Sequence, residues 1–143
     1  MAELPQQLLL QVATPHGLAL KAQVRSVQAP SVWGEFGVLP GHLPLLASLK
    51  SGILRYQIEN QEHKAAIGPG FAEVAQETMR ILTEHFATPA EIDVKATRHE
   101  LEATETKRKE LAKQPDADPD ELNQLDRQID WCQSRLDVAA DRL

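Results

Sequence analysis

Glycine is confined to the first part of this 143-residue chain. All seven glycines fall within residues 1–87, and residues 88–143 contain none. Glycine supplies the backbone angles that tight turns need, and it weakens helices. The distribution therefore predicts a turn-rich β domain over residues 1–87 and a helical domain over residues 88–143.

The first domain carries short runs in which apolar and polar residues alternate, as in half-buried strands. Residues 8–12 and 18–24 are two such runs, and the turn signal Pro15-His16-Gly17 separates them. Further runs cover residues 53–58, 63–67, 71–74 and 79–83. Short strands with frequent turns predict an antiparallel β-sandwich or barrel.

The second domain contains two similar helix-start signals, Thr88-Pro89-Ala90-Glu91 and Asp118-Pro119-Asp120-Glu121. Each places a capping oxygen, then proline at the first helical position, then an acid near the positive end of the helix dipole. We expect an antiparallel hairpin of two helices, each roughly 24 residues and so about 36 Å long.

The two predicted helices differ in their apolar stripes. The second has a regular spacing of three and four residues through Leu122, Leu125, Ile129, Cys132, Leu136, Ala139 and Leu143. In the first, Thr97, Thr104 and Arg108 interrupt the register of Val94, Leu101 and Leu111. A hairpin of this kind is marginally stable alone, so we expect it to pack on a further surface.

Composition excludes several classes of function. The net charge of −6 argues against nucleic-acid binding, and most of it lies in residues 114–143, where three basic residues face eight acidic ones. No apolar run approaches the length of a membrane span, so we expect no direct insertion into a membrane. The single cysteine, Cys132, excludes an internal disulfide, and its place in the apolar stripe predicts a buried small residue.

Signatures of catalysis are missing from the sequence. The five histidines show no metal-ligand spacing, and neither a phosphate-binding loop nor a nucleophile motif occurs. Glu35 and His42 are conceivable as an acid–base pair, but surface contacts or loop braces are the favoured interpretation. We therefore expect no catalytic residues, no metal and no cofactor. Trp33 is equally compatible with core packing and with a binding anchor.

Residues 34–46 read G-E-F-G-V-L-P-G-H-L-P-L-L and predict a shaped surface loop with its own hydrophobic anchors. The segment resembles the G-E-[apolar]-G-[apolar]-x-P-G-H signature of the epsilon subunit of bacterial rotary F-type ATP synthases. Residues 68–74, G-P-G-F-A-E-V, are similar to the S-G-G-[apolar]-x-E-V of that family, and Ile92-Asp93 to its [I/L]-D at the first helix. The resemblance spans essentially the whole chain.

The resemblance implies a sandwich of about ten strands, a two-helix hairpin and a non-catalytic subunit of the central stalk. In that family the sandwich binds the gamma subunit and stands on the ring of c subunits, at the cytoplasmic face of the bacterial plasma membrane. By resemblance, the residues that contact the c-ring are Glu35, Phe36, Val38, Pro40, Gly41 and His42.

The family also implies regulation by the hairpin, which in many members reaches the catalytic head and inhibits ATP hydrolysis. Arg127, Arg135 and Arg142 would then face the catalytic beta subunit. Some members bind ATP through [I/L]-D-x-x-R-A, but here alanine, Ala96, stands in place of the arginine after Ile92-Asp93, so only Asp93 matches in part. The alternative function is a free-standing interaction module that binds a partner helix through the apolar stripe of residues 122–143.

Overall fold

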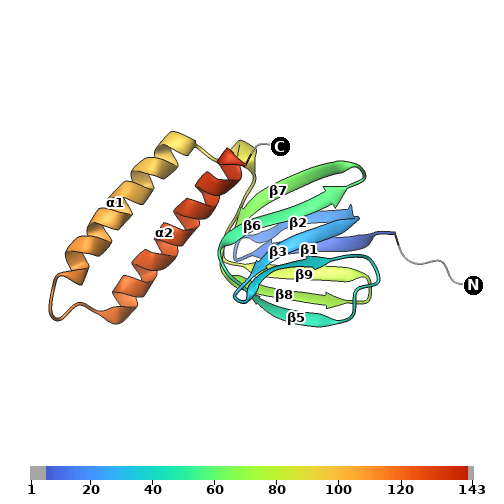
Figure 1. The fold of residues 1–143 in the computed structure, drawn as a ribbon, viewed down its shortest axis with the longest axis horizontal. Helices are drawn as coiled ribbons and strands as arrows, with labels where there is room; N and C mark the ends of the chain where they lie inside the picture. Colours follow the sequence, from blue (N-terminus) through green and yellow to red (C-terminus); the bar gives the residue numbers. More distant parts are fainter. Residues whose placement is uncertain (1–5, 142–143) are drawn as a thin grey trace, which may run out of the picture.

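The computed structural model describes residues 6–141 and confirms a β-sandwich followed by a helical hairpin (Figure 1). The strands are β1 (Leu8–Thr14), β2 (Gly17–Val24), β3 (Ser26–Ser31), β4 (Gly34–Val38), β5 (Leu45–Leu49), β6 (Gly52–Ile58), β7 (Gln61–Ile67), β8 (Gly70–Ala75), β9 (Thr78–Thr83) and β10 (Phe86–Ala87). A 3-10 turn, η1 (Pro89–Glu91), precedes α1 (Val94–Ala112) and α2 (Pro119–Ala140).

The strands form one hydrogen-bonded path that folds over into two layers. Its order is β10-β7-β6-β3-β5-β8-β9-β1-β2, with β4 paired to β3. The link between β3 and β5 is a single residue pair, Ser31 with Leu49, so it is the hinge between the layers. All pairings are antiparallel except that of β1 with β9, which is parallel.

An aliphatic core fills the space between the layers. Alternate residues of each strand point inward, as the period of two in the sequence predicts. Leu10, Val12, Leu54 and Met79 have no exposed surface at all. Aliphatic side chains dominate the core cluster within residues 6–141, and Tyr56 is its one buried aromatic residue, so the sandwich is closed without a large aromatic centre.

Residues 34–46 are only in part the loop that the sequence predicts. Residues 34–38 form strand β4, which pairs with β3, and β5 begins at Leu45. The loop proper is the connection from Leu39 to Pro44. The two glycines favoured a loop in the prediction, but Gly34, with φ +125°, is the first residue of β4, and Gly37 lies within the strand without a positive φ.

The first helix begins later than its start signal suggests. Thr88 and Glu91 do form a capping box, but it closes only the 3-10 turn η1. The chain is extended again at Ile92, and Asp93 becomes the N-cap of α1 by accepting a hydrogen bond from the Ala96 amide at 3.0 Å. The helices are therefore 19 and 22 residues long rather than 24 each. The second predicted start, Asp118-Pro119, is correct.

The hairpin packs on the sandwich, as its weak apolar face predicts. Helix α2 lies between α1 and the sandwich and contacts β6 and β7 (Figure 1). The threonines that seemed to interrupt the first stripe are the buried residues of α1, Thr97 and Thr104. Their hydroxyls donate to the carbonyls four residues earlier, so a polar side chain is buried without an unpaired group. No helix within residues 6–141 is long and apolar enough to cross a membrane.

Candidate functional site

The β4–β5 loop presents two exposed leucines on a braced turn. Leu39 is 63% exposed and Leu43 is 79% exposed. Between them the amide of His42 donates to the Leu39 carbonyl at 3.0 Å, and Gly41 has φ +83°, which favours glycine. The Nδ1 atom of His42 lies 2.6 Å from the Leu43 carbonyl, so this ring nitrogen is the donor and Nε2 is left free for a partner.

The six predicted contact residues divide into outward and inward side chains. Glu35, Gly41 and His42 are exposed, and Pro40 is half-buried. Phe36 packs against the core, and Val38 is 1% exposed. The prediction that Val38 contacts a partner is therefore wrong, because strand β4 directs it into the sandwich. Val38 and Phe36 are the anchors that hold this segment.

Glu35 and His42 do not form an acid–base pair. Glu35 lies at the start of β4, opposite Pro30, and His42 lies beyond the far end of the strand. The length of β4 separates them, and the His42 ring is engaged with its own loop. In the described part of the chain, no group of three or more histidine, cysteine or acidic residues could hold a metal ion.

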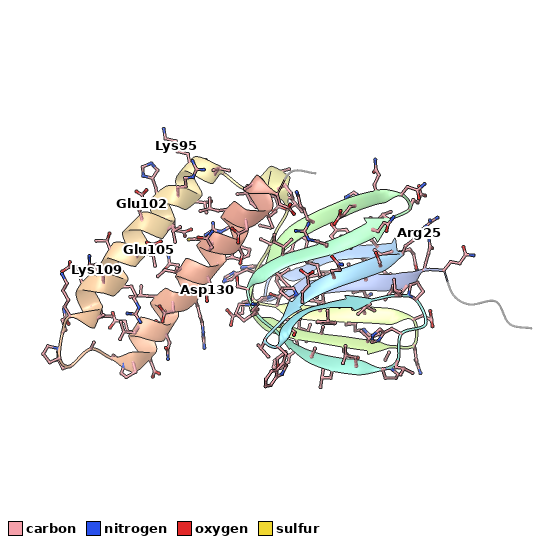
Figure 2. All side chains as sticks on the ribbon, in the orientation of Figure 1. Arg25, Lys95, Glu102, Glu105, Lys109 and Asp130 are labelled. Carbon is pink, nitrogen blue, oxygen red and sulfur yellow. The ribbon has the colours of Figure 1, made fainter. Side chains whose placement is uncertain are left out.

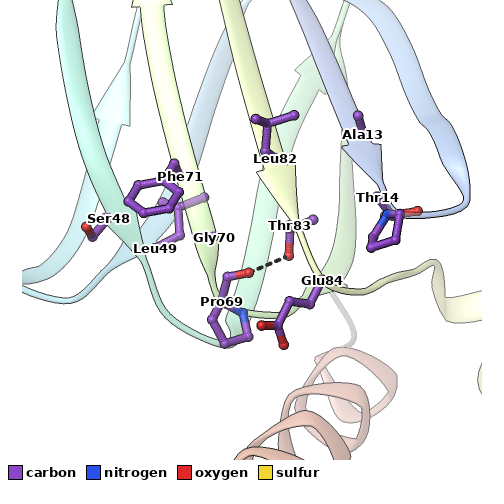
Figure 3. Close-up of a pocket in the computed structure, with 11 residues that line it drawn as sticks. Ala13, Thr14, Ser48, Leu49, Pro69, Gly70, Phe71, Leu82, Thr83 and Glu84 are labelled. Carbon is purple, nitrogen blue, oxygen red and sulfur yellow. Dashed lines mark hydrogen bonds between the residues drawn. The ribbon is translucent and has the colours of Figure 1, made fainter.

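An apolar row crosses the outer face of the layer β5-β8-β9-β1-β2. Register pairs align Ser48, Phe71, Leu82, Ala13 and Leu18 across the five strands. At about 4.8 Å per strand the row is roughly 19 Å long. Part of it lines an open groove of about 590 Å³, where Phe71 and Leu82 project from neighbouring strands (Figure 3). Phe71, Leu82 and Leu18 are 56%, 61% and 62% exposed.

The β3–β4 turn adds a nearly bare indole beside this row. Trp33 is 96% exposed, which excludes the core-packing interpretation. The buried Ser31 holds the turn, because its hydroxyl donates to the Gly34 carbonyl at 2.6 Å and accepts from the Trp33 amide at 3.1 Å. The neighbouring Val32 amide donates to the carbonyl of Ser48, which joins the turn to the end of the row. The turn thus presents Trp33 on a rigid support.

Several polar contacts join α2 to the sandwich. The hydroxyl oxygens of Ser51 and Ser134 are 2.7 Å apart, and Ser51 also donates to the Asp130 carbonyl at 3.3 Å. At the end of α2, the carboxylate of Asp141 lies 2.5 Å from Arg55 and 3.6 Å from Lys64. Close contact with Arg55 holds the pKa of Asp141 below its usual value. The two cations also face the negative end of the α2 dipole.

Trp131 links α2 to the sandwich by stacking. Its ring stacks on His85, in the connection between β9 and β10, with centroids 4.8 Å apart. The Arg135 guanidinium lies 5.1 Å from the Trp131 ring centroid and pairs with Glu100 of α1. Trp131 is therefore a bridge within the chain in this conformation.

Cys132 is fully buried, as the stripe predicts, and its thiol donates to Glu100 at 3.0 Å. Burial and the neighbouring Glu100 carboxylate raise the pKa of Cys132 to about 11. A thiol with so high a pKa is a poor nucleophile at neutral pH. Its role is therefore to pack and to donate a hydrogen bond.

The predicted basic face of α2 is not displayed as a unit. Arg127 is exposed, whereas Arg135 is held against Glu100 with only 18% of its side chain exposed. The prediction for Arg142 lies outside the described residues. Charged side chains do follow one another along exposed positions of α1, at Lys95, Glu102, Glu105 and Lys109, but both signs are present, so they form no basic face (Figure 2).

Sequence patterns did not decide whether Trp33 packs in the core or serves as a binding anchor. They did not predict that Leu43 and the apolar row on the outer face are exposed. Single exposed apolar residues look like core residues in one sequence, since only strand register shows which face they occupy. The register is set by pairs such as Phe71 with Leu82, which lie in different strands.

Comparisons with known proteins agree with this architecture. Residues 7–89 match the family model described as ATP synthase, Delta/Epsilon chain, beta-sandwich domain. The ATP synthase epsilon chain of Citrifermentans bemidjiense is 37% identical over 106 residues, which cover 74% of this chain and 77% of that protein. That of Carboxydothermus hydrogenoformans is 41% identical over 93 residues, 65% of this chain and 69% of the relative.

A solved structure extends the similarity to the helices. A chain in the Euglena gracilis mitochondrial ATP synthase, OSCP/F1/c-ring assembly, superposes with a TM-score of 0.78 at 24% identity and covers 98% of this chain and 85% of its own length. At this identity the match supports the fold, and the sequence matches support the family. The chain therefore belongs to the epsilon-chain family of F-type ATP synthases, whose members are non-catalytic subunits of the central stalk.

Proposed function

We propose that this chain binds the gamma subunit through the outer face of its sandwich and stands on the c-ring through the β4–β5 loop. In this position it would couple ion-driven rotation of the ring to the catalytic head. One observation carries the proposal: within residues 6–141, all eight exposed large hydrophobic residues belong to the sandwich and none to the hairpin. Clustered apolar exposure of this kind marks protein interfaces.

The two surfaces suit a part that transmits torque. The row on the outer face is built on five paired strands, so load on Phe71 or Leu82 is shared across the ladder. The β4–β5 loop is held by Val38 in the core and by the turn at Gly41. Glu35 and His42 then offer polar contacts around the exposed Leu39 and Leu43. An interface with an apolar centre and polar rim resists shear without performing chemistry.

We propose a peripheral location for the chain, on the cytoplasmic face of the bacterial inner membrane, because the c-ring would hold it there. The apolar stripe of α2 does not favour the free-standing module. Leu125, Cys132 and Val138 are already buried within the chain, so a partner helix would have to displace α1 or the sandwich.

The two interfaces are separable by mutation. Leu82→Glu places a charge in the apolar row, and Leu43→Asp places one in the loop. We expect Leu82→Glu to abolish capture of the gamma subunit and Leu43→Asp to abolish capture of the c-ring, each leaving the other interaction intact. Glu102→Gln, on the exposed face of α1, is the matched control. Retention of gamma binding by Leu82→Glu would refute the assignment of the outer face.

We further propose that the hairpin inhibits ATP hydrolysis when it leaves the sandwich and reaches the catalytic beta subunit. The polar contact around Ser51 and Asp141 supports this, because polar contacts exchange readily for water. In the extended state Arg127 would be joined by Arg135, once Arg135 has left Glu100, and by Arg142.

A disulfide can test the hairpin in the assembled complex. The hydroxyls of Ser51 and Ser134 are close enough for Ser51→Cys with Ser134→Cys to form a bridge, in a Cys132→Ala background. Oxidation should hold α2 on the sandwich and raise ATP hydrolysis, and reduction should reverse the effect. The Cys132→Ala single variant, treated identically, controls for oxidation of other subunits. Equal hydrolysis in both redox states would refute inhibition by the extended hairpin.

A further inference from the structure

A small pocket lies at the start of α1, and its lining residues determine whether the hairpin can bind a nucleotide there. It has a volume of about 350 Å³. It includes Ile92 and Asp93, the run that matches in part the ATP motif of some relatives, and Arg135 reaches it from α2. The lining residues are Glu91, Ile92, Asp93, Ala96, Thr97, Glu100 and Arg135.

The charge of this pocket opposes a nucleotide. Glu91, Asp93 and Glu100 contribute three carboxylates, and Arg135 contributes the one cation among the seven lining residues. Phosphate sites in proteins use arginine or lysine together with free backbone amides. With Ala96 at the motif position of arginine, Arg135 is the one lining residue that could pair with a phosphate.

Arg135 already contacts three side chains of its own chain. Its Nη2 atom donates to Oε2 of Glu100 and lies 3.2 Å from the Cys132 sulfur. The Trp131 ring covers it at 5.1 Å. Burial alone would raise the pKa of Glu100, but hydrogen bonds from Cys132 and Arg135 and attraction to Arg135 together lower it. Glu100 is therefore ionised at neutral pH and neutralises Arg135.

Two of the amides at the start of α1 are also occupied, those of Ala96 and Thr97. The Asp93 carboxylate accepts from the Ala96 amide, and the Asp93 carbonyl accepts from the Thr97 amide at 2.9 Å. The Glu91 carboxylate accepts from the Thr88 hydroxyl at 2.7 Å and from the Thr88 amide at 3.3 Å. A phosphate at this helix end would lie beside the Asp93 carboxylate, which already accepts from the Ala96 amide and repels a second anion.

We propose that Glu100 is a built-in anion that takes the place of a bound phosphate opposite Arg135. The hairpin then closes on itself without nucleotide, and the pocket does not bind nucleoside triphosphates. Closure depends on a cross-helix contact of Glu100 with Arg135 and Cys132 instead of on a ligand. The inference deepens the proposed regulation by the hairpin and rests on that proposal only for its consequence in the complex, since the contact itself belongs to the isolated chain.

Nucleotide binding can be measured through Trp131, which lies against Arg135. In a Trp33→Phe variant of the full chain Trp131 is the sole tryptophan, because the sequence has two. We expect no saturable change in its fluorescence when ATP is added to millimolar concentration, with or without Mg²⁺. A saturable change would overturn the proposal.

Closure can be measured by hydrogen exchange of the α1 amides. Glu100→Gln keeps the shape of the side chain and removes its charge, so exchange in α1 should accelerate roughly fivefold or more, the factor for about 1 kcal/mol. Glu102→Gln is the matched control and should exchange like the parent chain. Unchanged exchange in Glu100→Gln would overturn the proposal.

Arg135→Gln provides a second variant for a double-mutant cycle with Glu100→Gln. If the two side chains act as one lock, the double variant should exchange no faster than the faster single variant. Additive acceleration would overturn the lock. All these variants leave the sandwich surfaces intact, so they should still bind the gamma subunit. Failure of the parent chain to bind the gamma subunit would instead refute the proposed function.

Discussion

Replacing Gly70 by alanine should destabilise the sandwich more than any other change of equal size in β8. Gly70 begins β8 opposite Thr83 of β9, at the end of the apolar groove. A Cβ atom placed there would lie 1.9 Å from the carbonyl oxygen of Leu82 and 2.8 Å from the Cα of Thr83. Both neighbours are backbone atoms, so no side-chain rotation can relieve the clash.

The size of this destabilisation depends on how far the backbones of β8 and β9 must move apart. Extra methylenes in a packed core cost about 1–3 kcal/mol when side chains can adjust. Here β8 and β9 must separate locally, which weakens their pairing by about one hydrogen bond, or roughly 1 kcal/mol. Alanine returns about 0.4–1 kcal/mol by restricting the unfolded chain. We expect a net loss of about 3 kcal/mol in the free energy of unfolding, or about 10 °C in Tm for a chain of this size.

Urea denaturation followed by circular dichroism measures this loss, and Gly37→Ala is its control. A Cβ atom at Gly37 would have its nearest contact 3.9 Å away, at the Val27 carbonyl oxygen, so the free energy of unfolding should change by less than about 1 kcal/mol. The two variants add the same methyl group to strands of one sandwich. A loss below about 1 kcal/mol for Gly70→Ala, or equal losses for both, would refute the steric argument.

Three further outcomes are expected. The folded-state pKa values of Glu100 and Asp141 lie below their unfolded values, so both carboxylates stabilise the hairpin at neutral pH and this contribution is lost as the pH falls through those lowered values. The near-ultraviolet dichroism of Trp131 should therefore weaken below about pH 4, and an unchanged signal at about pH 3 would contradict the reasoning. Asp141→Asn should make α2 more sensitive to limited proteolysis, whereas Glu102→Gln should leave cleavage unchanged. Gln76 and Glu77 form the two-residue turn between β8 and β9, and their φ values of 49° and 65° are typical of a type I′ turn. Gln76→Asn with Glu77→Gly should therefore raise the free energy of unfolding by about 1 kcal/mol in the same urea assay, and a decrease would contradict this turn type.

Most of the strands that the sequence predicts show plain alternation, whereas β3 and β4 do not. β1, β2, β6, β8 and β9 alternate between more buried and more exposed residues, so their period of two is visible. β7 buries its last three residues, so a short apolar run marks it instead of an alternation. β3 contains Pro30 and buries three consecutive residues at its end, and β4 contains two glycines. Their identity as strands comes from their partners, which a single sequence does not display.

The candidate site also contains residues that the sequence predicts and residues that only the fold brings together. The β4–β5 loop was predictable because Pro40 and Gly41 constrain its backbone locally. The apolar row was not, since Leu18, Phe71 and Leu82 come together only through register between strands. The occupied state of Arg135 was also hidden, because Glu100 lies thirty-five residues away and pairs with it only when the hairpin closes.

Polar contacts recur in the hairpin, both between its two helices and between α2 and the sandwich. Thr97 and Thr104 are buried with their hydroxyls bonded to carbonyls of their own helix, so the buried residues of α1 are polar. Arg108 and Asp126 pair across the helices at 2.9 Å, and Glu100 pairs with Arg135, so closure draws on ions that water also solvates well. Ser51, Ser134 and Asp141 repeat this pattern against the sandwich. Each of these contacts is inexpensive to exchange for water, whereas the core around Leu10 and Met79 is not. This difference supports the proposal that the hairpin leaves the sandwich while the sandwich itself stays folded.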